Sequence, residues 1–158
     1  MGATLQHFLG KFDEFKTLPS GKSFSIKVTD QEATAAANEY LTENKAQVSQ
    51  LLQKTTGMNL EVEKPSIGFK NDELLLSAMG GMGFLKAKAT LDADVQWSGQ
   101  PTVVVRSVKV PVVSVTPEKL NSVVEKPLKQ LMEKVEEYAE IHNFKLQDGF
   151  AVLEAVRK

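Results

Sequence analysis

The chain has 158 residues, of which 42% are hydrophobic and 25% charged, and its formal net charge is −1 at pH 7. This composition is typical of a soluble globular protein, and we expect a single domain spanning residues 1–158. Because the charges nearly balance, the chain has no overall attraction to nucleic acid, and we expect no nucleic-acid partner. Cysteine is absent, which excludes disulfides, thiolate metal sites and a cysteine nucleophile.

The chain contains no run of about eighteen apolar residues, so we expect no membrane-spanning helix. Its start also lacks the pattern of a signal peptide. We keep two cellular locations open, because a chain from which a natural leader had been removed would also begin with Met1-Gly2. The protein is extracytoplasmic and membrane-associated if an anchor preceded it, and cytoplasmic otherwise.

The segment up to Leu18 carries apolar residues at i, i+3, i+4 and i+7, which predicts an amphipathic helix. Pro19-Ser20-Gly21 ends it. We expect this helix at the periphery of the domain, where its apolar face is a candidate anchor for a partner protein or a second copy of the chain. The face consists of Leu5, Phe8, Leu9, Phe12 and Phe15.

A short strand over 24–28 and a second helix are expected next. Thr29 and Glu32 have the spacing of a capping box, in which each satisfies a backbone N–H of the other at a helix start. This helix is expected to run to about Thr55. Gly57 is placed to end it in the left-handed conformation.

The segment after Gly57 has β character. We expect strands interrupted at Pro65, a turn at Asn71-Asp72 and a two-residue hairpin turn at Gly80-Gly81, where glycine accepts positive φ. A strand from Leu85 to Trp97 follows, in which apolar and polar residues alternate without a break. Since successive strand side chains point to opposite faces, one face lies against an apolar interior and the other in water.

Another valine-rich strand is expected over 103–115, with a bulge near Arg106-Ser107 where the alternation slips. A third helix follows, with Thr116 as its cap and Pro117 at its first position. Its apolar stripe extends to Ala139.

The proline at position 127 predicts a kink in one continuous third helix, because it removes a backbone hydrogen bond. Closing strands are expected around a turn at Asp148-Gly149.

Residue types that support catalysis or metal binding are few. His7 and His142 are far apart and lack metal-binding spacing. We interpret His142 as a favourable charge at the C-terminal end of the third helix. Asp92 and Asp94 share a strand face with lysines, and we interpret them as a solvated surface. The sequence therefore predicts no catalytic residues, no metal and no cofactor.

The small residues Ala87, Ala89 and Ala93 leave space beneath the long strand. If packing is complete, the third helix fills this space; if packing is incomplete, an elongated apolar groove remains for a lipid-like molecule. The candidate ligand-binding residues come from the long strand, the methionine that follows the Gly80-Gly81 turn, and the third helix. They are Met82, Leu85, Ala87, Ala89, Leu91, Trp97, Leu128, Leu131, Met132 and Val135.

The layout of the chain resembles that of a broad bacterial group of small, membrane-anchored extracytoplasmic proteins. The resemblance rests on the order of the elements over residues 23–158. A strand leads into a capped helix at residues 23–32, long meandering strands follow, and a valine-rich strand leads into Thr116-Pro117-Glu118-Lys119-Leu120-Asn121, an amphipathic helix and a closing strand around Asp148-Gly149. The group comprises YpmS-like proteins and proteins similar to tubular lipid-binding domains. The resemblance implies an apolar cavity or groove and no enzymatic activity.

Together these observations predict an α+β domain in which a curved antiparallel sheet of five or six long strands wraps around the kinked third helix, with two further helices in the N-terminal third. The expected function is a non-catalytic binding module for a lipid or other apolar ligand at the cell envelope. The alternative is a protein–protein interaction or self-association module that uses the apolar face of the N-terminal helix.

Overall fold

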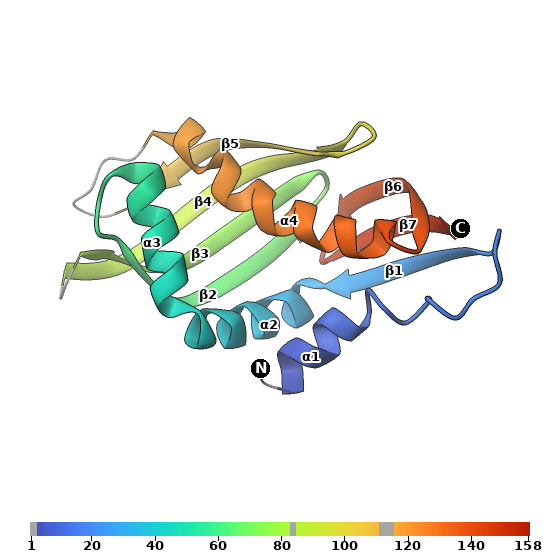
Figure 1. Ribbon diagram of the computed structural model, residues 1–158. Helices are drawn as coiled ribbons and strands as arrows, with labels where there is room; N and C mark the ends of the chain where they lie inside the picture. The colour runs from blue at the N-terminus through green and yellow to red at the C-terminus, as the bar shows by residue number, and fades with distance from the viewer. Residues whose placement is uncertain (1–2, 83–84, 111–115) are drawn as a thin grey trace.

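The computed structural model describes residues 3–82, 85–110 and 116–158. In chain order the elements are α1 (Ala3–Gly10), β1 (Ser23–Thr29), α2 (Asp30–Glu43), α3 (Lys45–Thr56), β2 (Glu61–Lys70), β3 (Glu73–Met82), β4 (Leu85–Trp97), β5 (Pro101–Lys109), a 3-10 turn η1 (Pro117–Leu120), α4 (Asn121–Glu136), β6 (Ala139–Gln147) and β7 (Phe150–Arg157). The strands form a three-stranded sheet of order β1-β7-β6 and a four-stranded sheet of order β2-β3-β4-β5 (Figure 1).

The two-sheet architecture corrects the expectation of one curved sheet wrapped around the third helix. The reason lies in the pairing of β1, which runs antiparallel to β7 from Ser23 opposite Val156 to Thr29 opposite Phe150. β7 thus lies between β1 and β6, and none of these three strands pairs with β2, β3, β4 or β5. The strands therefore divide into two sheets. The broader prediction of an α+β fold with antiparallel sheets is confirmed.

Helices cover both edge strands of the four-stranded sheet. Along β2, the Thr34 hydroxyl of α2 donates to the Ile67 carbonyl (3.1 Å) and accepts the Ile67 N–H (2.9 Å). Along β5, the side-chain oxygen of Asn121 accepts the Val105 N–H at 2.8 Å. These side chains occupy backbone groups that would otherwise be open to a further strand, which keeps this sheet separate from the other.

The strand from Leu85 to Trp97 is confirmed with its predicted bounds. The bulge is also confirmed, because Asp92 lies opposite Ser107 while Ala93 lies opposite Val105, which leaves Arg106 as the extra residue. The predicted hairpin turn at Gly80-Gly81 is wrong. Both glycines belong to β3 and pair with β4, and the connection at residues 83–84 lies outside the described part of the chain.

The first two expected helices are shorter than predicted. The α-helical part of the N-terminal segment ends at Gly10, since glycine costs about 1 kcal/mol relative to alanine in a helix; tight turns continue it, as in the Lys16 N–H bond to the Asp13 carbonyl (3.2 Å). The second helix breaks at Asn44 into α2 and α3, so the N-terminal third holds three helices. The predicted Thr29 capping box and the left-handed Gly57, with φ of 77°, are confirmed.

The third helix begins and ends differently from the prediction. Thr116 makes no capping hydrogen bond with its side chain, and the 3-10 turn η1 precedes α4. Pro127 lies inside one continuous helix, as predicted. The helix ends at Glu136, and Ala139 already begins β6, so His142 lies on a strand and not at a helix end. The expected strand over 103–115 ends at Lys109, and residues 111–115 lie outside the described chain.

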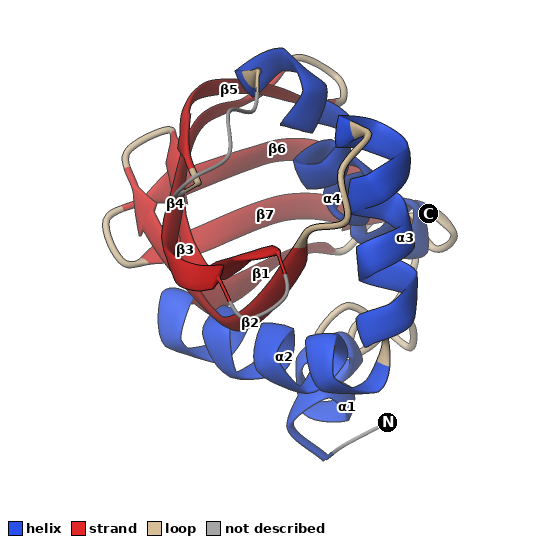
Figure 2. Cartoon of the chain, turned by 90° about the vertical axis from the view of Figure 1, so that its left-hand side faces the viewer, coloured by secondary structure: helices blue, strands red, loops and turns tan. Residues whose placement is uncertain are grey.

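The hydrophobic core lies between the two sheets and the helices that surround them (Figure 2). One cluster joins the three-stranded sheet to the second half of α4 and includes Val135 and Ala139, both 0% exposed. A second cluster, around Ala93, joins the four-stranded sheet to α3 and η1. Leu128 and Phe144 pack against both clusters, so the core is continuous.

Candidate functional site

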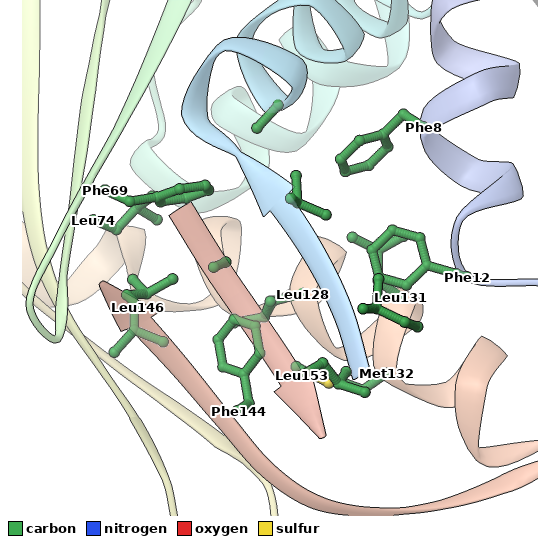
Figure 3. A pocket seen from close by; sticks show the side chains of 15 residues that line it. Phe8, Phe12, Phe69, Leu74, Leu128, Leu131, Met132, Phe144, Leu146 and Leu153 are labelled. Atoms are coloured by element: carbon green, nitrogen blue, oxygen red, sulfur yellow. The ribbon is translucent and has the colours of Figure 1, made fainter. Parts of the chain in front are cut away.

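An apolar cavity of about 100 Å³ lies where the two core clusters meet (Figure 3). It is partly enclosed, and side chains from both sheets, α1, α2 and α4 line it. All of its lining residues are apolar: Phe8, Phe12, Ile26, Val28, Ala33, Phe69, Leu74, Val95, Leu128, Leu131, Met132, Phe144, Leu146, Ala151 and Leu153. We call this space the apolar cavity. Its wall offers water no hydrogen-bond partner, whereas hydrocarbon needs none.

The first wall of the cavity follows from the register of the three-stranded sheet. Leu153 of β7 lies opposite Ile26 on one side and Phe144 on the other, so these three side chains share one face. Two residues along, Ala151 lies between Val28 and Leu146 and uses that same face. Small Ala151 between larger neighbours leaves part of this wall recessed.

The second wall comes from the four-stranded sheet, and backbone hydrogen bonds between turns hold it against the first. Gly149 N–H donates to the Phe69 carbonyl (2.9 Å), and Asp72 N–H donates to the Leu146 carbonyl (3.1 Å). These bonds place the β2–β3 turn beside the β6–β7 turn. Phe69 and Leu74, which pair across the β2–β3 hairpin, therefore face the cavity.

Helices complete the enclosure. Leu128, Leu131 and Met132 of α4 have the i, i+3, i+4 spacing that puts side chains on one helix face, and all three line the cavity. From the N-terminal segment come Phe8 and Phe12, whose rings meet edge to face at 5.5 Å between centroids. Figure 3 shows both rings pointing toward the cavity from the far side of β1.

The turn segment after α1 is fixed to the body of the domain. The buried Tyr138 hydroxyl donates a hydrogen bond to the Phe12 carbonyl. Arg157 Nε donates to the Lys16 carbonyl at 2.9 Å. The Phe15 ring stacks on Phe24 of β1 at 4.7 Å between centroids. The turn segment that carries Phe12 is consequently attached to the domain at three points.

Charged groups reinforce this attachment. Burial raises the pKa of Asp13, but the Lys16 and Lys134 ammonium groups, 3.0 and 3.1 Å from its oxygens, outweigh that effect and bring it below the ordinary 3.8. The hydrogen-bonded Lys11 ammonium, which forms an ion pair with Glu32 of α2, brings the pKa of Glu32 below its ordinary 4.5, although burial opposes this. Both carboxyl groups are thus charged at neutral pH.

The phenol of Tyr138 stays neutral over a wide pH range. Burial raises its pKa to about 12, the Asp13 charge acts in the same direction, and Arg157 opposes them. The neutral hydroxyl is the form that donates to the Phe12 carbonyl.

The structure distributes the predicted ligand-binding residues over two places. Leu128, Leu131 and Met132 line the apolar cavity. Val135 is fully buried beside it, and Trp97 packs against the core cluster that contains Val135. The remaining described members are partly exposed on the inner face farther along the four-stranded sheet: Ala87, Ala89 and Leu91. The side chains of Met82 and Leu85 lie outside the described part of the structure.

The predicted partner-binding residues pack within the chain itself. Phe8 and Phe12 line the cavity, Phe15 stacks on Phe24, and Leu9 is partly buried. The side chain of Leu5 is outside the described residues. The interaction hypothesis stays a prediction, but these aromatic side chains already have intramolecular partners.

Sequence reasoning missed the cavity residues on the three-stranded sheet and on β2 and β3. The alternation of Phe24, Ile26 and Val28 identified a strand with one apolar face, and the same signal was present around Phe144 and Leu146. The alternation does not show which strands share a sheet, because that depends on pairing between segments far apart in the chain.

The described chain offers little for other chemistry. It contains no group of three or more His, Asp or Glu side chains placed to hold a metal ion. His7 on α1 and His142 on β6 are both exposed. Among the helices that the structure describes, none is long and apolar enough to cross a membrane. Comparison of the chain with protein-family models and with curated proteins finds no match.

Proposed function

We propose that this protein is a non-catalytic binding module for a lipid-like ligand whose hydrocarbon end enters the apolar cavity. The observation that carries the proposal is the composition of the cavity wall, in which every lining side chain is apolar. A polar ligand group would lose its hydrogen bonds to water there without replacement, whereas hydrocarbon loses nothing. The ligand's polar group therefore stays outside.

The size of the cavity limits what enters it. An engineered apolar cavity of about 150 Å³ binds benzene or xenon. A volume of about 100 Å³ accordingly accommodates the end of an aliphatic chain or one small ring, and not a whole lipid. The cell envelope, where such ligands are abundant, is the proposed setting, and the layout resemblance described above supports it.

Native mass spectrometry of freshly purified protein tests whether a ligand is carried. We expect a discrete mass increment matching a lipid or fatty acid. Titration with cis-parinaric acid, a fatty acid whose fluorescence rises in apolar surroundings, tests the purified protein for saturable binding. A ligand-free mass together with no saturable fluorescence increase would contradict the proposal.

A matched pair of variants on α2 locates the binding. Ala33 lines the cavity and is 6% exposed, whereas Ala35, two residues away, is exposed. Ala33→Leu should fill part of the cavity and weaken cis-parinaric acid binding about tenfold or more, since several buried contacts of the guest are lost. Ala35→Leu should bind like the wild type. Equal affinities for both variants would place the probe elsewhere.

A further inference from the structure

We propose that α1 is a hinged cover over the apolar cavity, which swings about Gly10 to admit ligand while the turn segment 11–18 stays attached to the domain. This inference rests on the proposed function, because it concerns access to the same cavity. It assigns different roles to two parts of one N-terminal segment. The distinction follows from how each part is held.

The turn segment is held by polar contacts as well as by packing. Its Phe12 carbonyl accepts from Tyr138, its Lys16 carbonyl accepts from Arg157, and Asp13 forms an ion pair with Lys134 of α4. Lys11, the first residue after α1, forms an ion pair with Glu32 and donates to the Lys27 carbonyl (3.2 Å). These contacts reach α2, α4, β1 and β7, so the segment is fixed on several sides.

By contrast, the described side chains of α1 are held by packing, and backbone hydrogen bonds link the end of α1 only to the turn segment, from Lys11 N–H to the Phe8 carbonyl (3.2 Å) and from Phe12 N–H to the Leu9 carbonyl (3.1 Å). Over residues 6–10, whose side chains the structure describes, no side-chain hydrogen bond or ion pair reaches the rest of the domain. The helix lies against α2, outside both sheets (Figure 1). Its cavity contact is Phe8, which contributes to the wall from the outer side of β1 (Figure 3). Moving α1 would therefore open the cavity wall without breaking strand pairing.

Gly10 lies at the boundary between these two parts. A Cβ at this position would meet nothing within 4 Å, and the residue is not among those with positive φ. Neither lack of space nor a left-handed backbone therefore requires glycine here. What glycine does provide is a wide range of accessible φ and ψ at the point where a fixed segment meets a loosely held helix.

The rates of probe exchange test the hinge. Stopped-flow fluorescence with cis-parinaric acid gives association and dissociation rates for wild type and Gly10→Ala. Alanine narrows the backbone freedom of the hinge, so we expect both rates to fall by about two- to fivefold with an unchanged Kd. Phe8→Ala, which weakens the hold of α1 on the cavity, should speed dissociation about tenfold. Gln6→Ala, on the exposed side of α1, should exchange like the wild type.

Amide hydrogen exchange tests the motion without any probe. Opening breaks the bonds from the Lys11 and Phe12 N–H groups to the Phe8 and Leu9 carbonyls of α1. These two amides should therefore exchange faster than those of Lys16 and Leu18, whose bonds stay within the turn segment, and Gly10→Ala should slow them by the same two- to fivefold factor. Wild-type probe rates in Gly10→Ala, or equal exchange of the bridging amides (Lys11, Phe12) and the reference amides (Lys16, Leu18), would contradict the proposal that α1 is a hinged cover. If the wild type binds no probe, the proposed function fails, and hydrogen exchange alone decides whether α1 opens as a unit.

Discussion

The core beneath the three-stranded sheet and the middle of the β3–β4 hairpin follow the same alternating pattern in sequence but differ in burial. Under the three-stranded sheet, Leu153 and Ala155 are each 2% exposed, next to fully buried Val135 of α4. On the corresponding inner face of the hairpin, Leu76 and Ala89 are partly exposed. Alternation thus identifies the face of a strand that turns inward, but not the depth of its burial.

Strand length explains the difference. The 13 residues of β4 extend much farther than the eight of β7, which at ~3.3 Å per residue amounts to roughly 40 Å against 26 Å. The second half of α4 covers the shorter sheet, whereas the long hairpin continues past the core clusters. We expect stability to depend on the covered sheet far more than on the partly exposed inner face of the hairpin.

The largest expected effect tests this contrast directly. Leu153→Ala removes a side chain from the covered core and should lower the free energy of unfolding by about 2–5 kcal/mol. Leu76→Ala removes the same atoms from the partly exposed hairpin face and should cost about 1 kcal/mol, because less apolar surface returns to water. Urea denaturation measures both. Equal losses would show that the two faces are packed alike.

The next effect concerns the attachment of the N-terminal segment to the covered core. Tyr138→Phe leaves the Phe12 carbonyl without its donor, and we expect a loss of about 1–3 kcal/mol in unfolding free energy. Tyr40→Phe is the matched control, since Tyr40 is 48% exposed, and it should stay within about 0.5 kcal/mol of wild type. A neutral Tyr138→Phe would mean that packing alone holds the segment.

The same phenol predicts an alkaline transition. Because the folded-state pKa of Tyr138 is raised from 10.0 to about 12, its neutral form contributes stability that is complete below pH 10 and is lost as pH rises through 12. Urea midpoints between pH 9 and about 12 should fall more steeply for wild type than for Tyr138→Phe. Parallel declines would show that other groups cause the loss.

The smallest expected effect is a loss of stability at acidic pH. The pKa values of Asp13 and Glu32 are lowered from 3.8 and 4.5, so their ion pairs add stability above those values that is lost as pH falls through the lowered pKa. Both carboxyl groups are about one-third exposed, and solvent screening limits each pair to about 0.2–1 kcal/mol. Asp13→Asn should therefore be slightly destabilised at pH 6 and match wild type near pH 2. If Asp13→Asn stays less stable than wild type near pH 2, the loss comes from altered packing and not from the ion pair.

Local features were predictable wherever neighbouring residues decide the conformation. The bounds of β4, the bulge at Arg106, the Thr29 capping box and the left-handed Gly57 were all confirmed. Each depends on periodicity, a short-range hydrogen bond or an intrinsic φ preference. Of the candidate site, the three α4 side chains were identified for the same reason, since helical spacing places them on one face.

The sequence by itself therefore determined the apolar faces and the turns at Asn71-Asp72 and Asp148-Gly149, because these depend on residues a few positions apart. Only the tertiary structure decided that β1 pairs with β7, that α2 closes the β2 edge through Thr34, and that Phe8 and Phe12 turn inward. Those outcomes depend on contacts between segments far apart in the chain, where several pairings satisfy the same apolar pattern. The cavity exists because the pairing that forms brings faces from both sheets together around α4.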